Sequence, residues 1–137
     1  MSIYRLRIVV WSAALLFSGL FWYGAWRGVE YLAGSASVIV YDRGGRLGDY
    51  LDAMHEPQRI WGYCASGCTA LLGADDVCVT PKARLVFHQA STELGTLLLF
   101  AQYPTLVQGW IKARGGLTVT LLEMSGAEAI RLGVRRC

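Results

Sequence analysis

An uncharged, apolar run from Ile8 to Trp26 is the feature that most restricts what this chain can fold into. As an α-helix the run would be about 28 Å long at about 1.5 Å per residue, close to the thickness of the hydrocarbon core of a bilayer. Arg5 and Arg7 precede it, and aromatic residues gather at its far end, where membrane interfaces favour them. We therefore predict one membrane-crossing helix over residues 8–26, with the amino terminus in the cytoplasm and the rest of the chain on the other side of the membrane.

A cleavable signal peptide is the alternative, because the small residues from Ala33 to Ser37 could form a cleavage site. The apolar run is longer than the usual signal-peptide core of about 7 to 15 residues, which favours an uncleaved anchor. About 100 residues remain, which is enough for one small domain with one core and too few for two. We expect residues 1–34 to form a cytoplasmic stub and anchor, and residues 35–137 to form the domain.

Four cysteines in so short a chain indicate an oxidising compartment. They are Cys64, Cys68, Cys78 and Cys137. Cys78 and Cys137 both lie in strand-like segments and could bridge, which would leave Cys64 to pair with Cys68, although three pairings are possible. A zinc site is the other reading, but the spacing matches none of the usual arrangements. We expect disulfides, and neither a metal nor another cofactor.

The segment from Gly62 to Gln89 carries the candidate chemistry. Ser66 lies between small residues, where a strand-like approach gives way to a helix-like run that starts at Cys68. A strand-to-helix corner holds a hydroxyl away from the backbone and directs N–H groups to the same point. A serine nucleophile needs a base, and the two histidines of the chain are His55 and His88. Ser66 as a simple helix N-cap is the competing reading, worth about 1 kcal/mol of stability.

His88 is the better candidate for the base, because it ends a second apolar strand, whereas His55 lies in a polar stretch rich in turn residues. A parallel sheet would bring Ser66 and His88 together at its carboxyl edge, where open α/β folds place their sites. The competing reading is a hydrogen-bonded histidine at a strand end. Net charge is only +3, and basic residues are not interleaved with aromatic ones, so we expect no nucleic-acid partner.

These segments resemble the Clp-protease proteolytic subunit superfamily, in particular a small branch of secreted or membrane-anchored bacterial proteins. Residues 62–66 are similar to the G-x-x-A-S nucleophile segment of that family, and residues 81–89 to its P-x-x-R-x-x-x-H-Q base segment. Residues 42–46 resemble its glycine loop, and residues 125–134 its closing helix and strand. The resemblance implies an α/β domain with the Clp-protease and crotonase fold, built on a mainly parallel sheet. It also implies a bacterial protein, in which the predicted anchor would cross the inner membrane and the domain would face the periplasm.

The resemblance also implies roles for individual residues. The nucleophile, its base and the two N–H donors of an oxyanion hole would be Ser66, His88, Gly45 and Gly67. The acid that orients the histidine in the family falls on Leu121 here, so it is missing, and Glu123 is the nearest substitute. Loss of that acid costs roughly four orders of magnitude in the serine-protease template. We predict a periplasmic serine hydrolase or peptidase acting on a peptide or protein substrate, or an inactive relative that binds peptides or proteins.

Other segments give coarser expectations. Ser37 to Tyr41 is apolar at consecutive positions, which predicts a buried strand. Leucines and aromatic residues predict helices over 94–103 and 105–114, separated by Pro104. In the related large proteases this helical region carries subunit contacts, so an exposed apolar face there would imply a homo-oligomer.

Overall fold

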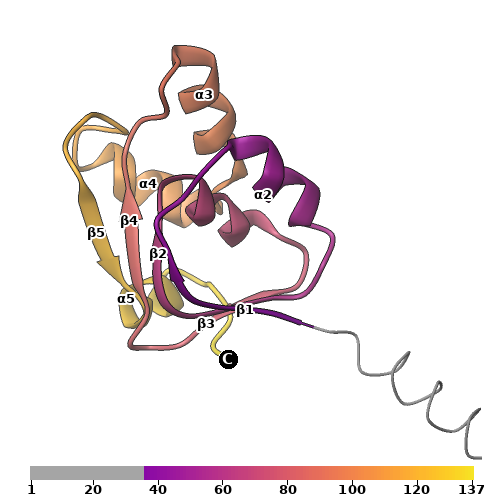
Figure 1. Ribbon diagram of the computed structural model, residues 1–137. Helices are drawn as coiled ribbons and strands as arrows, with labels where there is room; N and C mark the ends of the chain where they lie inside the picture. The colour runs from indigo at the N-terminus through magenta and orange to yellow at the C-terminus, as the bar shows by residue number, and fades with distance from the viewer. Residues whose placement is uncertain (1–35) are drawn as a thin grey trace, which may run out of the picture. The chain divides into compact units, whose positions relative to one another are not determined.

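The computed structural model describes residues 36–137, which form one compact unit (Figure 1). The predicted anchor over residues 8–26 and the predicted border between residues 34 and 35 lie outside the described residues. Among the helices of residues 36–137, none combines the length and the apolar character needed to cross a bilayer.

A five-stranded mixed sheet forms the centre of this unit. The strands are β1 (Ser37–Asp42), β2 (Gln58–Ala65), β3 (Val77–Val79), β4 (Arg84–Phe87) and β5 (Leu122–Ser125). β2 pairs in parallel with β1 on one side, and on the other side with β3 near its start and with β4 near its end. Only β5 runs antiparallel, next to β4. The predicted α/β class is confirmed, and every strand pairing except the last is parallel.

Short helices connect the strands and cover one face of the sheet (Figure 1). They are α2 (Leu47–Ala53), the 3₁₀ helix η1 (Ser66–Gly73), α3 (Glu93–Gln102), α4 (Thr105–Lys112) and α5 (Gly126–Arg131). The two helices predicted after His88 are confirmed to within a few residues, and Thr92 caps the first by accepting from the Gly95 N–H. The helical run predicted after Ser66 forms as a 3₁₀ helix.

The hydrophobic core lies between the sheet and the helices. Side chains alternate between the two faces of a strand, so every second strand residue points into the core. The inward set includes Ile39, Ile60, Leu85, Phe87 and Met124, all at most 9% exposed. From the helical side, Leu99 of α3 and Tyr103 pack into the core, and the Tyr103 ring meets Phe87 edge-on with centroids 5.2 Å apart.

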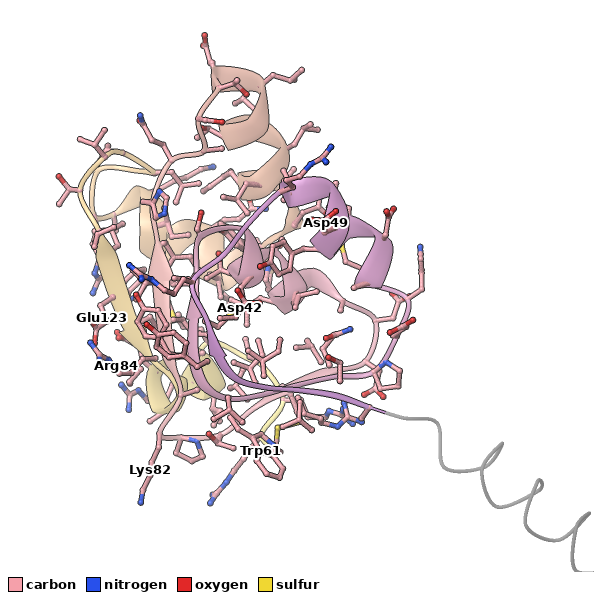
Figure 2. The ribbon with its side chains drawn as sticks, viewed as in Figure 1. Asp42, Asp49, Trp61, Lys82, Arg84 and Glu123 are labelled. Atoms are coloured by element: carbon pink, nitrogen blue, oxygen red, sulfur yellow. A yellow bond between two sulfur atoms is a disulfide. The ribbon has the colours of Figure 1, made fainter. Side chains whose placement is uncertain are left out.

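The other face of the sheet is open along β1 and β2, so the prediction of a buried strand over residues 37–41 is wrong. Only Ile39 of β1 is buried. Val38 and Val40 are 46% and 65% exposed, and Trp61 of β2 is 53% exposed; Figure 2 shows Trp61 on the outside of the molecule. The reason is that β1 is an edge strand with helices over one face only. Its apolar side chains on the other face, Val38 and Val40, are therefore left uncovered.

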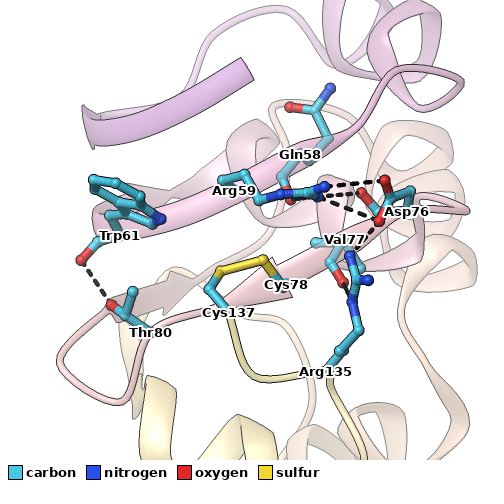
Figure 3. Close-up of a disulfide and its surroundings, with 9 residues drawn as sticks. All are labelled: Gln58, Arg59, Trp61, Asp76, Val77, Cys78, Thr80, Arg135 and Cys137. Carbon is cyan, nitrogen blue, oxygen red and sulfur yellow. Dashed lines mark hydrogen bonds and ion pairs between the residues drawn. A yellow bond between two sulfur atoms is a disulfide. The ribbon is translucent and has the colours of Figure 1, made fainter. Parts of the chain in front are cut away.

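Two disulfides connect the four cysteines, in the pairing that the sequence favours. Cys64 is joined to Cys68, and Cys78 to Cys137. The second bridge fixes the last residues against β3, where Val79 pairs in parallel with Arg136 (Figure 3). Because this bridge closes a sequence separation of 59 residues, it restrains the unfolded chain strongly.

Candidate active site

The carboxyl ends of three parallel strands meet at one edge of the sheet. Gly45 follows β1, Ser66 follows β2, and His88 follows β4. A cleft of about 410 Å³ opens at this edge, and Gly45, Ser66, Gly67 and His88 all line it. The sheet therefore brings to one cleft the four residues that the sequence singles out.

Ser66 is held in an unusual backbone conformation. Its φ is 54°, and it is the only non-glycine residue with positive φ among residues 36–137. This left-handed region costs an L-residue about 1–2 kcal/mol. The helix that follows is capped by Ala65 without a side-chain hydrogen bond, so the reading of Ser66 as an N-cap is wrong. Within the described residues the Ser66 hydroxyl has no hydrogen-bond partner, and it stands at the cleft.

The backbone around Ser66 is braced from both sides. The Cys64–Cys68 disulfide spans it with Cα atoms 5.5 Å apart, and both cysteines are fully buried. Beneath the corner, the Thr69 hydroxyl donates its one proton to the Ser66 carbonyl oxygen at 2.6 Å. The Tyr103 hydroxyl is therefore the donor in its 2.7 Å hydrogen bond with the Thr69 hydroxyl. Burial raises the pKa of Tyr103 above its ordinary value, which keeps this donor protonated. These bonds hold Ser66 in a conformation that it would not adopt alone.

The glycine loop after β1 lies directly against this corner. A Cβ on Gly44, which has φ +86°, would stand 2.6 Å from both the Ala65 carbonyl oxygen and Ser66 Cβ. A Cβ on Gly67 would stand 3.0 Å from the Gly45 carbonyl oxygen. No side chain fits at either position, so the two backbones approach as closely as glycine allows.

Two N–H groups at this meeting point are unused. Neither the Gly45 nor the Gly67 N–H donates a hydrogen bond to another of residues 36–137. Both glycines line the cleft, where an N–H without a protein partner is available to a ligand. Donors that face a cleft beside a serine hydroxyl are suited to bind an oxygen that gains negative charge.

Asp42 and Tyr50 hold the glycine loop and the corner together, a contact that the sequence did not reveal. The Asp42 carboxylate accepts from the Gly44 N–H at 2.8 Å and from the Tyr50 hydroxyl at 2.9 Å. The Tyr50 ring packs on Gly67, where an added Cβ would be 2.8 Å from it. Burial, and then the bond to Asp42, raise the pKa of Tyr50 to about 12. The only signal in the sequence is the helical spacing of Leu47, Tyr50, Leu51 and Met54, which favours an amphipathic helix with Tyr50 on its apolar face.

His88 lines the same cleft as Ser66. Its Nδ1 lies 2.7 Å from the carbonyl oxygen of Gln89. A carbonyl can only accept, so this contact places the proton on Nδ1 and leaves Nε2 free to act as a base. Within the described residues no hydrogen bond joins Ser66 to His88, and catalytic contacts of this kind are often long until substrate binds.

The proposed third member, Glu123, has another partner. Its carboxylate accepts two hydrogen bonds of 2.9 Å from Arg84, and the pair lies on the outer surface of β4 and β5 (Figure 2). The bond from Arg84 lowers the pKa of Glu123 below its usual range. In this structure Glu123 therefore does not orient His88. Leu122 pairs with Phe87, so the preceding residue, Leu121, lies in the segment that passes His88, and it is 63% exposed.

Residues 36–137 contain no cluster of three histidine, cysteine or acidic side chains that could hold a metal ion. Comparison of the chain with protein-family models, with curated proteins and with solved structures finds no match.

Proposed function

We propose that this chain is a serine hydrolase, and most simply a peptidase, of the Clp-protease and crotonase type. The observation that carries the proposal is Ser66 itself. It has positive φ, its hydroxyl has no hydrogen-bond partner within residues 36–137, and it lines the same cleft as His88. Non-glycine residues in this conformation occur preferentially at functional sites, where the surrounding structure imposes them. The unused N–H groups of Gly45 and Gly67 add the electrostatic part of the same chemistry.

The reaction follows from these positions. Ser66 Oγ attacks the carbonyl carbon of a peptide or other acyl group, and His88 Nε2 takes the hydroxyl proton. The carbonyl oxygen becomes an oxyanion, which the N–H groups of Gly45 and Gly67 stabilise. His88 then gives the proton to the leaving amine, and the C–N bond breaks. Water releases the acyl group from Ser66 by the same two steps, with His88 again as the base.

Slow turnover is part of the proposal. The carbonyl of Gln89 fixes the tautomer of His88, but it carries no negative charge to stabilise the imidazolium that forms during attack. In the serine-protease template, a histidine without its acid loses roughly four orders of magnitude in rate. Acylation by a reactive substrate is therefore a better readout than hydrolysis of an ordinary peptide.

A catalytically inactive module that binds peptides or proteins is the second candidate, and two observations favour it. Within residues 36–137, His88 has no acidic hydrogen-bond partner, and no hydrogen bond joins it to Ser66. Beside the cleft, α3 exposes Leu94, Leu97 and Leu98 by 67%, 63% and 44%. These leucines recur at helical spacing and form an apolar stripe, which suits an apolar peptide or the same stripe of a second copy in a homo-oligomer.

Covalent labelling separates the two candidates. The full chain is incubated with a fluorophosphonate probe, and the labelled residue is identified by mass spectrometry. We expect modification at Ser66, lost in Ser66→Ala and in His88→Ala. Ser91→Ala and His55→Ala are the matched controls, because Ser91 lines the same cleft and His55 is a solvent-exposed histidine. No labelling of a chain with both disulfides intact would leave only the binding module.

The membrane anchor over residues 8–26 and the periplasmic location belong to the same proposal. Two disulfides with no free cysteine among residues 36–137 support an oxidising compartment. The test is accessibility in intact cells. A protease added from the periplasmic side should remove the domain, and carbonate extraction should leave the anchor in the membrane fraction. A domain protected from the protease would refute the orientation.

A further inference from the structure

The open face of the sheet carries a second hollow, separate from the cleft. Its volume is about 500 Å³. The main residues that line it are Val38, Arg59, Trp61, Cys78, Arg135 and Arg136. The cleft lies at the carboxyl end of β2, where Ser66 follows the strand, whereas this hollow lies over the middle and start of β2, beside β1 and β3. It therefore belongs to another part of the surface and has no role in the proposed reaction.

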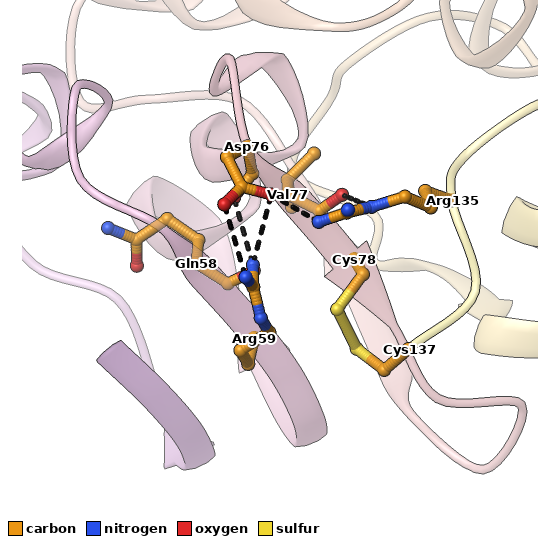
Figure 4. A network of polar contacts seen from close by, with 7 residues as sticks. All are labelled: Gln58, Arg59, Asp76, Val77, Cys78, Arg135 and Cys137. Carbon is orange, nitrogen blue, oxygen red and sulfur yellow. Dashed lines mark hydrogen bonds and ion pairs between the residues drawn. A yellow bond between two sulfur atoms is a disulfide. The ribbon is translucent and has the colours of Figure 1, made fainter. Parts of the chain in front are cut away.

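The rim of the hollow is cationic. Arg59 and Arg135 both bind Asp76, which shares one negative charge between two guanidinium groups (Figure 4). The hydrogen bond from Arg59 lowers the pKa of Asp76, so this carboxylate stays charged. Arg136 and Lys82 are exposed and form no ion pair within residues 36–137. Asp76 and the terminal carboxylate of Cys137 offset part of the charge of the four cations, and the surroundings of the hollow stay net positive.

The floor of the hollow is apolar and aromatic. Trp61 is 53% exposed, and its backbone carbonyl accepts a hydrogen bond from the Thr80 hydroxyl (Figure 3). Lys82, two residues after Thr80, lies at the same end of the molecule as Trp61 (Figure 2). Val38 is 46% exposed across the strand pair, and the Cys78–Cys137 disulfide closes one side. An exposed tryptophan with apolar neighbours and a rim of cations is the composition that favours the boundary between lipid headgroups and acyl chains.

We propose that this hollow docks on the surface of an anionic lipid bilayer, with Trp61 and Val38 at the level of the headgroups and Arg136 and Lys82 near lipid phosphates. The length of chain before β1 fits this occupant. Only residues 27–36 separate the uncharged run from Ser37, a stretch that spans at most about 35 Å when extended. This length lets the hollow reach the membrane that the proposed anchor would cross, and the charge of the hollow is complementary to an anionic lipid surface. Docking in this way turns the cleft, at the other end of β2, away from the lipid.

Site-specific photocrosslinking tests the proposal on the full chain. A benzophenone amino acid replaces Trp61 in one variant and Val38 in a second, and the protein is reconstituted in vesicles of mixed neutral and anionic phospholipids. The matched control carries the same group at Leu97 of α3, which is 63% exposed but lies beside the cleft. We expect lipid adducts at positions 61 and 38, with yields several-fold above position 97. Lys82→Glu combined with Arg136→Glu should lower those yields roughly fivefold or more, because each cation near an anionic surface contributes measurably to binding.

Several outcomes would overturn the proposal. Adducts to a second copy of the chain would make the hollow a dimer interface, and adducts to residues 27–35 would make it a binding site for the chain's own linker. Equal lipid yields at positions 61 and 97 would show proximity through the tether without docking. The proposal rests on the anchor, and flotation of the chain with vesicles reports the anchor independently. A chain that floats without the position-specific adducts refutes the docking alone.

Discussion

Replacing Ser66 by glycine and by alanine tests whether the fold strains this residue. Both variants remove the hydroxyl, but only glycine adopts a φ of 54° without cost. If the surrounding contacts force Ser66 into this conformation, Ser66→Gly should be more stable than Ser66→Ala. The comparison concerns the backbone alone, because Ser66 Oγ has no hydrogen bond within residues 36–137 that either variant would lose.

The expected size follows from two opposing effects. An L-residue in the left-handed region costs about 1–2 kcal/mol, which glycine recovers. Glycine also increases the conformational entropy of the unfolded chain, which lowers stability by about 0.4–1 kcal/mol relative to alanine. The balance is a gain in the free energy of unfolding of about 0.7 kcal/mol for Ser66→Gly over Ser66→Ala. In a domain of about 100 residues, such a gain raises the midpoint of thermal unfolding by about 3–5 °C.

A matched pair at Ser91 cancels the effect on the unfolded chain. Ser91 lines the same cleft, is exposed and has negative φ, so Ser91→Gly should be less stable than Ser91→Ala. Subtracting the Ser91 difference from the Ser66 difference should leave about 1–2 kcal/mol, the cost of the left-handed backbone. The assay is urea unfolding of the full chain in detergent, followed by near-ultraviolet circular dichroism with both disulfides intact. A difference of zero, or one of opposite sign, would mean that Ser66 is not strained and would remove the main support for a nucleophile.

Three further predictions concern Tyr50, the two disulfides and Leu121. Tyr50→Phe removes the hydroxyl that binds Asp42, so fluorophosphonate labelling should slow by about tenfold while the fold persists. The fold raises the pKa of Tyr50 from 10.0 to about 12, so the wild-type chain should lose stability as pH rises from 10 towards 12. Tyr50→Phe should lack that loss. Replacing both cysteines of one bridge by serine should lower the free energy of unfolding, measured by urea unfolding. The expected loss is about 4 kcal/mol for Cys78–Cys137 and about 2 kcal/mol for Cys64–Cys68, because the bridges close sequence separations of 59 and 4. Leu121→Asp puts a carboxylate in the segment beside His88 and should speed labelling at least about tenfold, whereas Val119→Asp, at another exposed position in that segment, should not.

The position of the cleft was predictable from the sequence because it depends on the topology of the sheet. Parallel strands end at the same edge of a sheet, so residues that follow apolar strands converge there whatever the details of packing. Ser66 and His88 each follow such a strand, and the glycine loop follows a third. The disulfide pairing was predictable for a related reason, since Cys78 and Cys137 both lie in segments that extend along the sheet.

The sequence could not predict features that depend on what covers a surface. Consecutive apolar residues in β1 fit both a strand buried on two faces and an edge strand with one face open, and the structure has the second. The bond between Asp42 and Tyr50 depends on how α2 returns to the loop before it, which no short motif encodes. The partner of Glu123 was missed because the spacing of residues does not show which face of β5 a side chain occupies, and Glu123 lies on the outer face with Arg84.

The small size of the domain explains why the strained corner and the disulfides occur together. A unit of about 100 residues has a net stability of about 5–15 kcal/mol, and this one leaves part of a sheet face without a covering layer. The left-handed backbone of Ser66 costs about 1–2 kcal/mol, which is a large fraction of that net stability. The Cys64–Cys68 bridge restrains the two sides of that corner directly, and the Cys78–Cys137 bridge offsets its cost by restricting the unfolded chain. Reduction removes both effects together, so the reduced chain should unfold at a lower urea concentration than the oxidised chain.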